Sequence, residues 1–209
     1  LEHAGRLQTL IVDKTGTLTE GRPTVTDVTP LGGATREDVL RIAASLEQGS
    51  THPLAQAVLA AARAEGIEPV AIDGFMSAPG KGVTARVGAD AVASVLGSLD
   101  FIAESGAAVD PTTSAALARQ GKTLVGLARD GQALGILALA DALRPTSAAA
   151  VRRLRDAGIA VIMMTGDNAE TAAAIAREAG IVEFRAGVLP AAKADAVRAL
   201  KAKGVVTGM

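Results

Sequence analysis

The sequence predicts an α/β fold in which a doubly wound parallel sheet is interrupted, after its first strand, by an inserted α+β domain. Residues 146–207 alternate helical and strand-like segments, which is typical of a parallel sheet with helices on both faces. The apolar run Leu10–Val12 has the same character, whereas the middle of the chain carries short β segments and hairpin signals. We therefore expect one discontinuous domain made of residues 1–21 and 134–209, and a second domain made of residues 22–133.

The composition supports helices layered on a sheet and excludes several classes of protein. Hydrophobic residues make up 49% of the 209 residues, but only three are Phe and none is Trp or Tyr, so the core must come from Leu, Ile, Val and Ala. The formal net charge of −1 gives no electrostatic reason to expect a nucleic-acid partner. The absence of cysteine excludes disulfides and thiolate metal sites. The longest apolar stretch is far shorter than the ~20 residues that span a bilayer.

Each expected element has a local signal. Thr35 with Asp38 is close to a capping box, His52-Pro53 precedes a second helix, and Asp130-Gly131 is a strong hairpin signal. The expected helices of the insertion are 36–46, 54–64, 98–104 and 111–120, and its expected strands are 25–28, 75–96 in short pieces, 122–127 and 133–139. After Pro145 we expect helices 146–156, 169–178 and 191–201 and strands 159–164 and 205–207.

The stretch LQTLIVDKTGTLTEG (residues 7–21) places polar groups directly after a buried strand. Asp13 would lie at the carboxyl end of that strand, where open α/β sheets bind their ligands. Lys14, Thr15 and Thr17 then add a cation and two hydroxyls, and Gly16 adds a flexible backbone, all suited to phosphate oxygens. The carboxylate is a candidate metal ligand, nucleophile or both. The alternative is a polar loop that merely follows a strand.

Two later segments carry similar chemistry. In VIMMTGDN an apolar strand runs into Thr165, Gly166 and Asp167 at the start of a helix, whose free N–H groups favour anions. Asp167 and Glu170 would equally form a capping box and nothing more. Lys193 lies early in the helix after Leu189-Pro190, where the macrodipole opposes a cation, although most such lysines are simply solvated.

Together, DKTGTLT, TGDN and LPAAKADAVRAL resemble in order the phosphorylation domain of P-type ATPases, the cation pumps that pass through an aspartyl-phosphate. DALRP at 141–145 is similar to the hinge motif of that family. The resemblance implies a haloacid-dehalogenase-like phosphorylation domain in which Asp13 attacks the γ-phosphate of ATP. It also implies roles for the other residues of these motifs: phosphoryl binding by Lys193, Thr165 and Gly166, shaping of the site by Asp167, a place for Lys14 in the same loop, and Mg²⁺ binding by Asp13 and the Thr15 carbonyl.

Thr15 distinguishes two kinds of enzyme with this core. Phosphatases of the superfamily carry a second Asp at this position as general acid and base, and a threonine cannot do that work near neutral pH. A long-lived aspartyl-phosphate follows, which suits a transport cycle. The alternatives are a capped phosphatase of the same superfamily and a nucleotide-binding module without turnover.

The insertion indicates which class of P-type ATPase the sequence resembles. SLEQGSTHPLAQAV and APGKGV resemble the nucleotide-binding domain of the heavy-metal class, the copper and zinc pumps. The implied nucleotide-binding residues are Glu47, Ser50 and His52 (with Pro53), the glycines Gly80 and Gly82, and Gly97-Ser98, where the family often has Gly-Asn. The glycines would let the backbone approach the nucleotide without a Cβ.

The resemblance also sets the expected context. We expect the chain to be a cytoplasmic piece of an integral membrane protein, working with the transmembrane and actuator domains of the same pump, while absent membrane helices handle the heavy-metal ion. The printed sequence stops at Met209, before the Gly-Asp-Gly-x-Asn-Asp motif whose Asp is a Mg²⁺ ligand. We therefore expect these 209 residues to bind ATP but hydrolyse it poorly.

Overall fold

The computed structural model describes residues 7–188, 190–202 and 206–208, and they separate into two compact units. Unit 1 comprises the described residues of Leu1–Gly21, Ala118–Gly121 and Asp141–Met209. Unit 2 comprises Arg22–Leu117 and Lys122–Ala140. The chain therefore leaves unit 1 after Gly21, returns to it for the short segment Ala118–Gly121, and returns again after Ala140.

Unit 1 contains a four-stranded parallel sheet in the order β10-β1-β8-β9. Its strands are β1 (Thr9–Asp13), β8 (Ala160–Met164), β9 (Glu183–Arg185) and β10 (Thr207–Gly208). The central pair is in register from Thr9 opposite Ala160 to Asp13 opposite Met164. Because the strands are parallel, the loops after β1 and β8 leave the sheet at the same edge.

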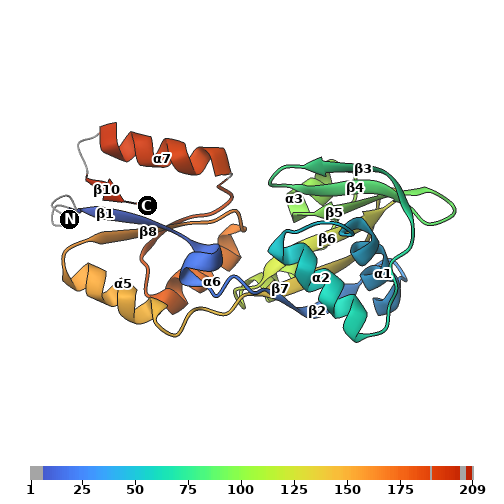
Figure 1. Ribbon diagram of the computed structural model, residues 1–209, viewed down its shortest axis with the longest axis horizontal. Helices are drawn as coiled ribbons and strands as arrows, with labels where there is room; N and C mark the ends of the chain where they lie inside the picture. Colours follow the sequence, from blue (N-terminus) through green and yellow to red (C-terminus); the bar gives the residue numbers. More distant parts are fainter. Residues whose placement is uncertain (1–6, 189, 203–205, 209) are drawn as a thin grey trace. The chain divides into compact units, whose positions relative to one another are not determined.

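Helices cover both faces of this sheet, as the sequence predicts (Figure 1). Val12, Val161 and Met163 pack in one cluster with the helices α5 (Ser147–Asp156) and α6 (Ala169–Ala179). The alternate positions Ile11, Ile162 and Met164 pack on the other face, with a residue of α7 (Pro190–Ala202). A strand buried on both faces reads as a continuous apolar run, which explains the patterns LIV and VIMM. Strand β9 was not expected, because the segment Glu-Phe-Arg is short and its residues do not form the apolar pattern of a strand.

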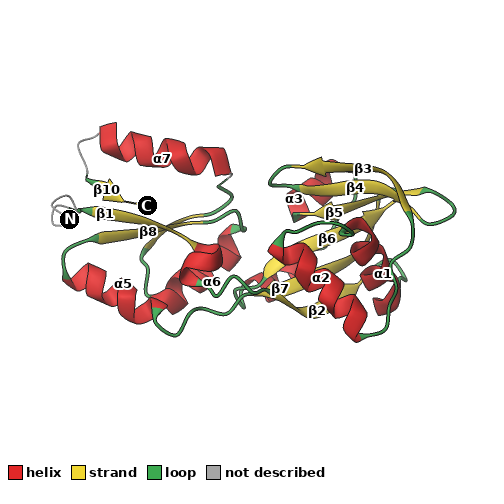
Figure 2. Ribbon diagram, viewed as in Figure 1, coloured by secondary structure: helices red, strands yellow, loops and turns green. Residues whose placement is uncertain are grey.

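Unit 2 contains a six-stranded antiparallel sheet in the order β2-β7-β6-β5-β4-β3 (Figure 2). Its strands are β2 (Thr24–Pro30), β3 (Ile72–Ala78), β4 (Gly82–Val87), β5 (Val92–Gly97), β6 (Thr123–Arg129) and β7 (Gln132–Ala140). Helices α1 (Arg36–Leu46) and α2 (Pro53–Ala64) pack on one face, where Leu40 and Val58 share a cluster with Leu96 and Leu127.

The opposite face carries α3 (Leu99–Glu104), and α4 (Pro111–Ala118) follows it in the chain. Ile102 of α3 is fully buried in a smaller cluster with Val95 and Ala128. The local signals of the sequence are confirmed here. Thr35 and Asp38 form a reciprocal capping box, and Asp130 and Gly131 both have positive φ in the tight β6–β7 turn.

The expected return to the first domain at residue 134 falls inside strand β7. This strand pairs with β6 and with β2 as far as Ala140, and its residues from Gly135 to Leu139 are buried. The apolar run does not end at Leu134, so unit 2 extends to Ala140. Among the residues that the structure describes, no helix is both long and apolar enough to cross a membrane.

Candidate functional site

The loop after β1 is held by its own backbone. Its residues Lys14–Leu18 form a single wide turn, η2, closed by a 3.0 Å bond from the Thr19 N–H to the Lys14 carbonyl. The half-buried Asp13 precedes it, and its Oδ1 accepts the Lys14 N–H at 2.7 Å. Gly16 has φ of +76°, a conformation that side chains with a Cβ rarely adopt. Thr15 is extended and exposed.

A buried ion pair joins this loop to the loop after β8. Lys14 Nζ lies 2.5 Å from Asp167 Oδ2, and the two side chains are 6% and 8% exposed. The Thr165 hydroxyl donates to the same carboxylate oxygen at 2.8 Å. Both loops start from paired strands, since Asp13 is opposite Met164 and Thr165 follows Met164 directly. The structure therefore brings Asp13, Lys14, Thr165 and Asp167 to one edge of the sheet.

Asp167 does not cap α6. The N-cap is Asn168, whose side chain accepts the Thr171 N–H at 2.9 Å. The alternative interpretation of Asp167 with Glu170 as a capping box is therefore wrong. Asp167 is turned toward Lys14 instead, and its backbone carbonyl accepts the Gly187 N–H at 2.8 Å. The neighbouring Gly166 is exposed.

A second set of hydrogen bonds joins Thr19, which sequence reasoning did not single out, to Asp141 of the DALRP segment. Thr19 is fully buried, and its Oγ1 lies 2.6 Å from Asp141 Oδ2 and accepts the Gly16 N–H at 3.1 Å. The other oxygen of Asp141 accepts the Gly21 N–H at 3.0 Å. Asp141 thus ties the first segment of unit 1, which ends at Gly21, to the last segment, which begins at Asp141 itself. The available signal was the hinge-like DALRP segment.

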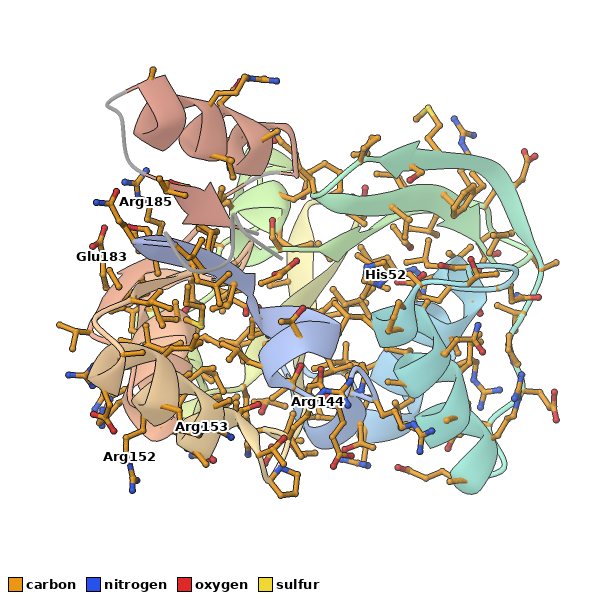
Figure 3. The ribbon with its side chains drawn as sticks, turned by 60° about the vertical axis from the view of Figure 1, so that its left-hand side comes forward. His52, Arg144, Arg152, Arg153, Glu183 and Arg185 are labelled. Carbon is orange, nitrogen blue, oxygen red and sulfur yellow. The ribbon has the colours of Figure 1, made fainter. Side chains whose placement is uncertain are left out.

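The DALRP segment also reaches the tip of the loop after β1. Arg144, labelled in Figure 3, donates from Nη2 to the Gly16 carbonyl at 3.1 Å. The buried Ser147 hydroxyl donates to the Leu18 carbonyl at 2.7 Å. Lys193 lies in the first turns of α7, as expected, but its side chain falls outside the described part of the structure. Its predicted contact with a phosphoryl group therefore stays a prediction.

In unit 2, Glu47, Ser50 and His52 form a connected group between α1 and α2. Glu47 caps the end of α1, and its carboxylate accepts a hydrogen bond from the Ser50 side chain. Ser50 Oγ accepts the His52 N–H at 3.3 Å. Burial raises the pKa of the Glu47 carboxyl above its usual value, and the hydrogen bond from Ser50 opposes that effect without cancelling it.

His52, labelled in Figure 3, is the N-cap of α2 and is exposed. Its Nδ1 accepts the Leu54 N–H at 3.2 Å, and Pro53 occupies the first helical position. An imidazole whose Nδ1 accepts carries its proton on Nε2, so His52 presents an N–H donor on the other side of the ring.

Gly82 and Gly97 lie opposite each other on β4 and β5, and both are glycines for a structural reason. A Cβ on Gly82 would lie 2.2 Å from the Leu96 carbonyl oxygen and 2.8 Å from Phe101. The missing side chain of Gly82 thus makes room for β5 and α3. Ser98 likewise has a structural task, because its hydroxyl accepts the Phe101 N–H at 3.2 Å and caps α3.

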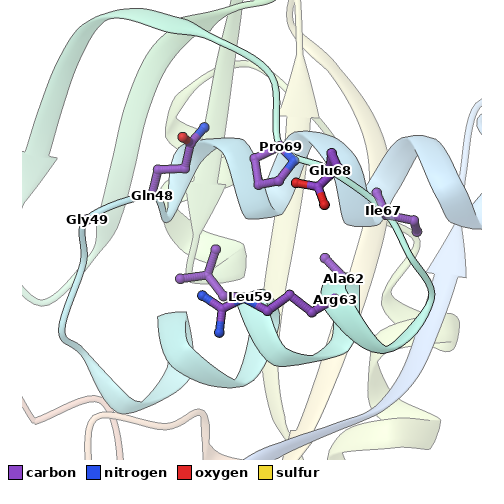
Figure 4. Close-up of a pocket in the computed structure, with 8 residues that line it drawn as sticks. All are labelled: Gln48, Gly49, Leu59, Ala62, Arg63, Ile67, Glu68 and Pro69. Atoms are coloured by element: carbon purple, nitrogen blue, oxygen red, sulfur yellow. The ribbon is translucent and has the colours of Figure 1, made fainter.

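A pocket of about 440 Å³ lies beside α2 in unit 2 (Figure 4). Its lining combines apolar side chains with the polar Gln48, Arg63 and Glu68; the remaining lining residues are Gly49, Leu59, Ala62, Ile67 and Pro69. None of the residues predicted to bind nucleotide lines this pocket.

The oxygen donors predicted for Mg²⁺ lie in the loop after β1. Within residues 7–188, 190–202 and 206–208, no three His, Asp or Glu side chains gather in a way that could hold a metal ion. The Asp13 carboxylate and the Thr15 carbonyl are hard oxygen donors from neighbouring positions, which is the donor type that Mg²⁺ takes together with water and substrate phosphates. The donor chemistry therefore fits.

Comparison with protein families identifies the broad class. The family model described as haloacid dehalogenase-like hydrolase matches residues 7–209. The chain belongs to this family. Unit 1 has the doubly wound parallel sheet predicted from the sequence for this family. Asp13 lies at the carboxyl end of its strand β1.

Within the haloacid dehalogenase-like hydrolases, this chain is similar to heavy-metal P-type ATPases. It is 43% identical over 213 residues to a copper-transporting P-type ATPase of Rhizobium leguminosarum bv. viciae, covering all of this chain and 25% of that protein. It is 41% identical over 211 residues to a silver exporting P-type ATPase of Salmonella typhimurium, with the same coverage. The chain thus spans about a quarter of the length of these relatives.

Solved structures show likenesses of two kinds. A zinc-transporting PIB-type ATPase in the E2.Pi state is 36% identical with a TM-score of 0.58, over 97% of this chain and 32% of that one. The catalytic domain of the CPx-ATPase CopB-B, from a study of its changes upon nucleotide binding, has a TM-score of 0.77 and covers 99% of this chain and 71% of that one. At 23% identity, this second likeness supports the fold alone.

Proposed function

We propose that this chain is the catalytic part of a heavy-metal P-type ATPase, in which unit 2 binds ATP and Asp13 of unit 1 accepts its γ-phosphoryl group. The observation that carries the proposal is the arrangement at the sheet edge of unit 1. Asp13 ends β1 opposite the strand that leads into Thr165, and the Lys14–Asp167 ion pair fixes the two loops to each other.

In the proposed reaction, an Asp13 carboxylate oxygen attacks the γ-phosphorus while the bond to the β-phosphate oxygen breaks, which leaves an acyl-phosphate and ADP. A carboxylate is a competent nucleophile in such transfers. The chain's own residues hold the loop still: Gly16 and Thr19 shape it, and Lys14 anchors it. Gly166, Thr165 and Lys193 are the proposed donors to the phosphoryl oxygens, whose developing charge such groups stabilise.

Asp13 and the Thr15 carbonyl would hold Mg²⁺. When bound, the ion screens the charge of the phosphoryl group as the carboxylate approaches. Thr15 stands where phosphatases of the superfamily have a second Asp. Because it cannot act as a general acid and base near neutral pH, the acyl-phosphate would persist, which favours the pump over the phosphatase.

The nucleotide site is proposed in unit 2. The Glu47 carboxylate is an acceptor and the His52 Nε2–H is a donor, a combination that suits the adenine edge, which offers both a donor and an acceptor. Gly80, Gly82, Gly97 and Ser98 would line the rest of the site with backbone. In the full protein, transmembrane and actuator domains would complete the pump, and the ATP-binding part would lie on the cytoplasmic side. Copper and silver in the names of the relatives make a soft heavy-metal cation the proposed cargo.

The test is phosphoenzyme formation from [γ-³²P]ATP by a full-length protein that contains this chain. We expect a labelled, hydroxylamine-sensitive protein that disappears in Asp13→Asn. The control is Asp156→Asn, at the exposed end of α5, which should be labelled normally. Equal labelling of the Asp13→Asn protein would overturn the proposal. The expectation that the 209 residues alone form the acyl-phosphate poorly stays a prediction, and the same assay on the 209-residue chain tests it.

A further inference from the structure

Lys81 is presented from a rigid turn between two glycines of the candidate nucleotide site. It lies between strands β3 and β4, where its N–H donates to the Ala78 carbonyl at 3.0 Å and its carbonyl accepts the Ser98 N–H at 2.8 Å. Gly80, with φ of +74°, turns the chain just before it. Both backbone polar groups of Lys81 are therefore hydrogen-bonded within unit 2.

The Lys81 ammonium is held by one carboxylate. Its Nζ lies 2.8 Å from both oxygens of Glu104, the last residue of α3. The helix that carries Glu104 packs against the sheet, because its residue Ile102 is fully buried there. The two side chains are nevertheless 44% and 56% exposed. An ion pair this exposed contributes little to stability and exchanges readily for a stronger partner.

A polyphosphate is such a partner. It carries more negative charge than one carboxylate, and a lysine ammonium binds phosphate oxygens through the same charge-assisted hydrogen bonds that it makes here to Glu104. We propose that Lys81 binds the polyphosphate of the nucleotide, and that Glu104 holds the Lys81 ammonium in the nucleotide-free protein. This inference rests on the proposed nucleotide site of unit 2, to which it adds a phosphate-binding residue.

The proposal predicts opposite effects at the two ends of one ion pair. Lys81→Gln should weaken ATP binding by about 3- to 10-fold, because one charge-assisted contact is lost. Glu104→Gln should tighten it by about 2-fold, because a competing carboxylate is removed. The double variant should behave like Lys81→Gln, since Glu104 acts only through Lys81. A purely structural ion pair would instead make both single variants weaker.

The measurement is titration calorimetry of the 209-residue chain with adenosine, AMP, ADP and ATP, in EDTA so that no metal screens the phosphates. In the wild type, affinity should rise as phosphates are added; in Lys81→Gln that rise should shrink while adenosine binding stays unchanged. Arg36→Gln is the matched control, because Arg36 and Glu65 form another exposed ion pair in unit 2. It should alter no affinity.

The possible outcomes separate the two proposals. If the wild type binds none of the four ligands, the nucleotide site itself is wrong. If the wild type shows the phosphate-dependent rise and Lys81→Gln keeps it in full, the site stands and the assignment of Lys81 is overturned. Urea unfolding of each variant, followed by circular dichroism, checks that a loss of affinity does not come from a loss of folded protein.

Discussion

In unit 1 the candidate residues lie at the ends of neighbouring parallel strands and in the loops that follow, and they bond to one another across the chain. In unit 2 they lie in loops and at strand ends, and their hydrogen bonds are mainly to groups nearby in the sequence. Lys14 and Asp167 are 153 positions apart in the chain, yet form a buried ion pair. His52 and Ser98 instead cap the helices that follow them. The first arrangement is fixed by tertiary structure and the second by local structure, so the two should respond very differently to substitution.

The largest effect is expected at the buried ion pair of unit 1. Asp167→Ala removes the carboxylate beside a Lys14 ammonium that is almost inaccessible to water, and breaking one side of such a pair costs about 3–5 kcal/mol. Urea unfolding should show this loss. The double variant Lys14→Met/Asp167→Leu should recover much of it, because no buried charge remains. A loss below about 1 kcal/mol in Asp167→Ala would mean that the pair does not hold the two loops together.

A smaller loss of stability is expected at Gly82 of unit 2, where strands β4 and β5 pack closely. Gly82→Val places a Cβ 2.2 Å from the Leu96 carbonyl oxygen, so β4 and β5 must separate, at a cost of about 3 kcal/mol. Loss of ATP binding by this variant would therefore report unfolding and not a lost contact. Gly88→Ala is the control: it meets no atom within 4 Å, and its strained φ of +80° should cost only about 1 kcal/mol. Equal stability of the two variants would contradict the packing argument.

Local capping and ligand binding can be separated at His52. His52→Ala removes the acceptor for the Leu54 N–H and should lower the free energy of unfolding by about 1 kcal/mol. His52→Asn keeps a capping oxygen, so its stability should stay near that of the wild type. Both variants lack the Nε2–H, so both should weaken ATP binding by about 1–3 kcal/mol in calorimetry. If only the alanine variant loses affinity, His52 serves the helix and not the nucleotide.

Features of the two units that depend on local sequence can be predicted, whereas features that depend on tertiary contacts cannot. Continuous apolar runs and capping residues are local, so strands β1 and β8 of unit 1, the capping box at Thr35 and the turn at Asp130 follow from the sequence, whereas strand β9 does not. The partners of Lys14 and Thr19 are set by which loops meet at a sheet edge, and no local pattern encodes them. Gly82 illustrates the difference: its motif indicated a ligand, and only the structure shows the strand and helix that also need the space.

The smallest effect concerns the charge of Glu47, whose pKa is raised by burial. Burial raises this pKa in the folded protein, so folding favours the protonated carboxyl of Glu47. The contribution of Glu47 to the free energy of unfolding is therefore most favourable at low pH and is lost as the pH rises through the pKa of the folded state. Glu47→Gln mimics the protonated form, so it should match the wild type at low pH, where the carboxyl is protonated, and be slightly more stable than the wild type at neutral pH.

Glu65→Gln provides a control of opposite sign. The hydrogen bond with Arg36 lowers the pKa of Glu65, so its charge stabilises the folded state above the normal carboxyl range and this benefit disappears in acid. Urea unfolding of both variants and the wild type at several pH values measures the two differences directly. The stability gap should open with rising pH in both cases, in favour of Gln at position 47 and in favour of Glu at position 65. A gap at position 47 that favours Glu at pH 7 would mean that the hydrogen bond from Ser50 outweighs burial, and that the loop between α1 and α2 already stabilises a carboxylate before any ligand arrives.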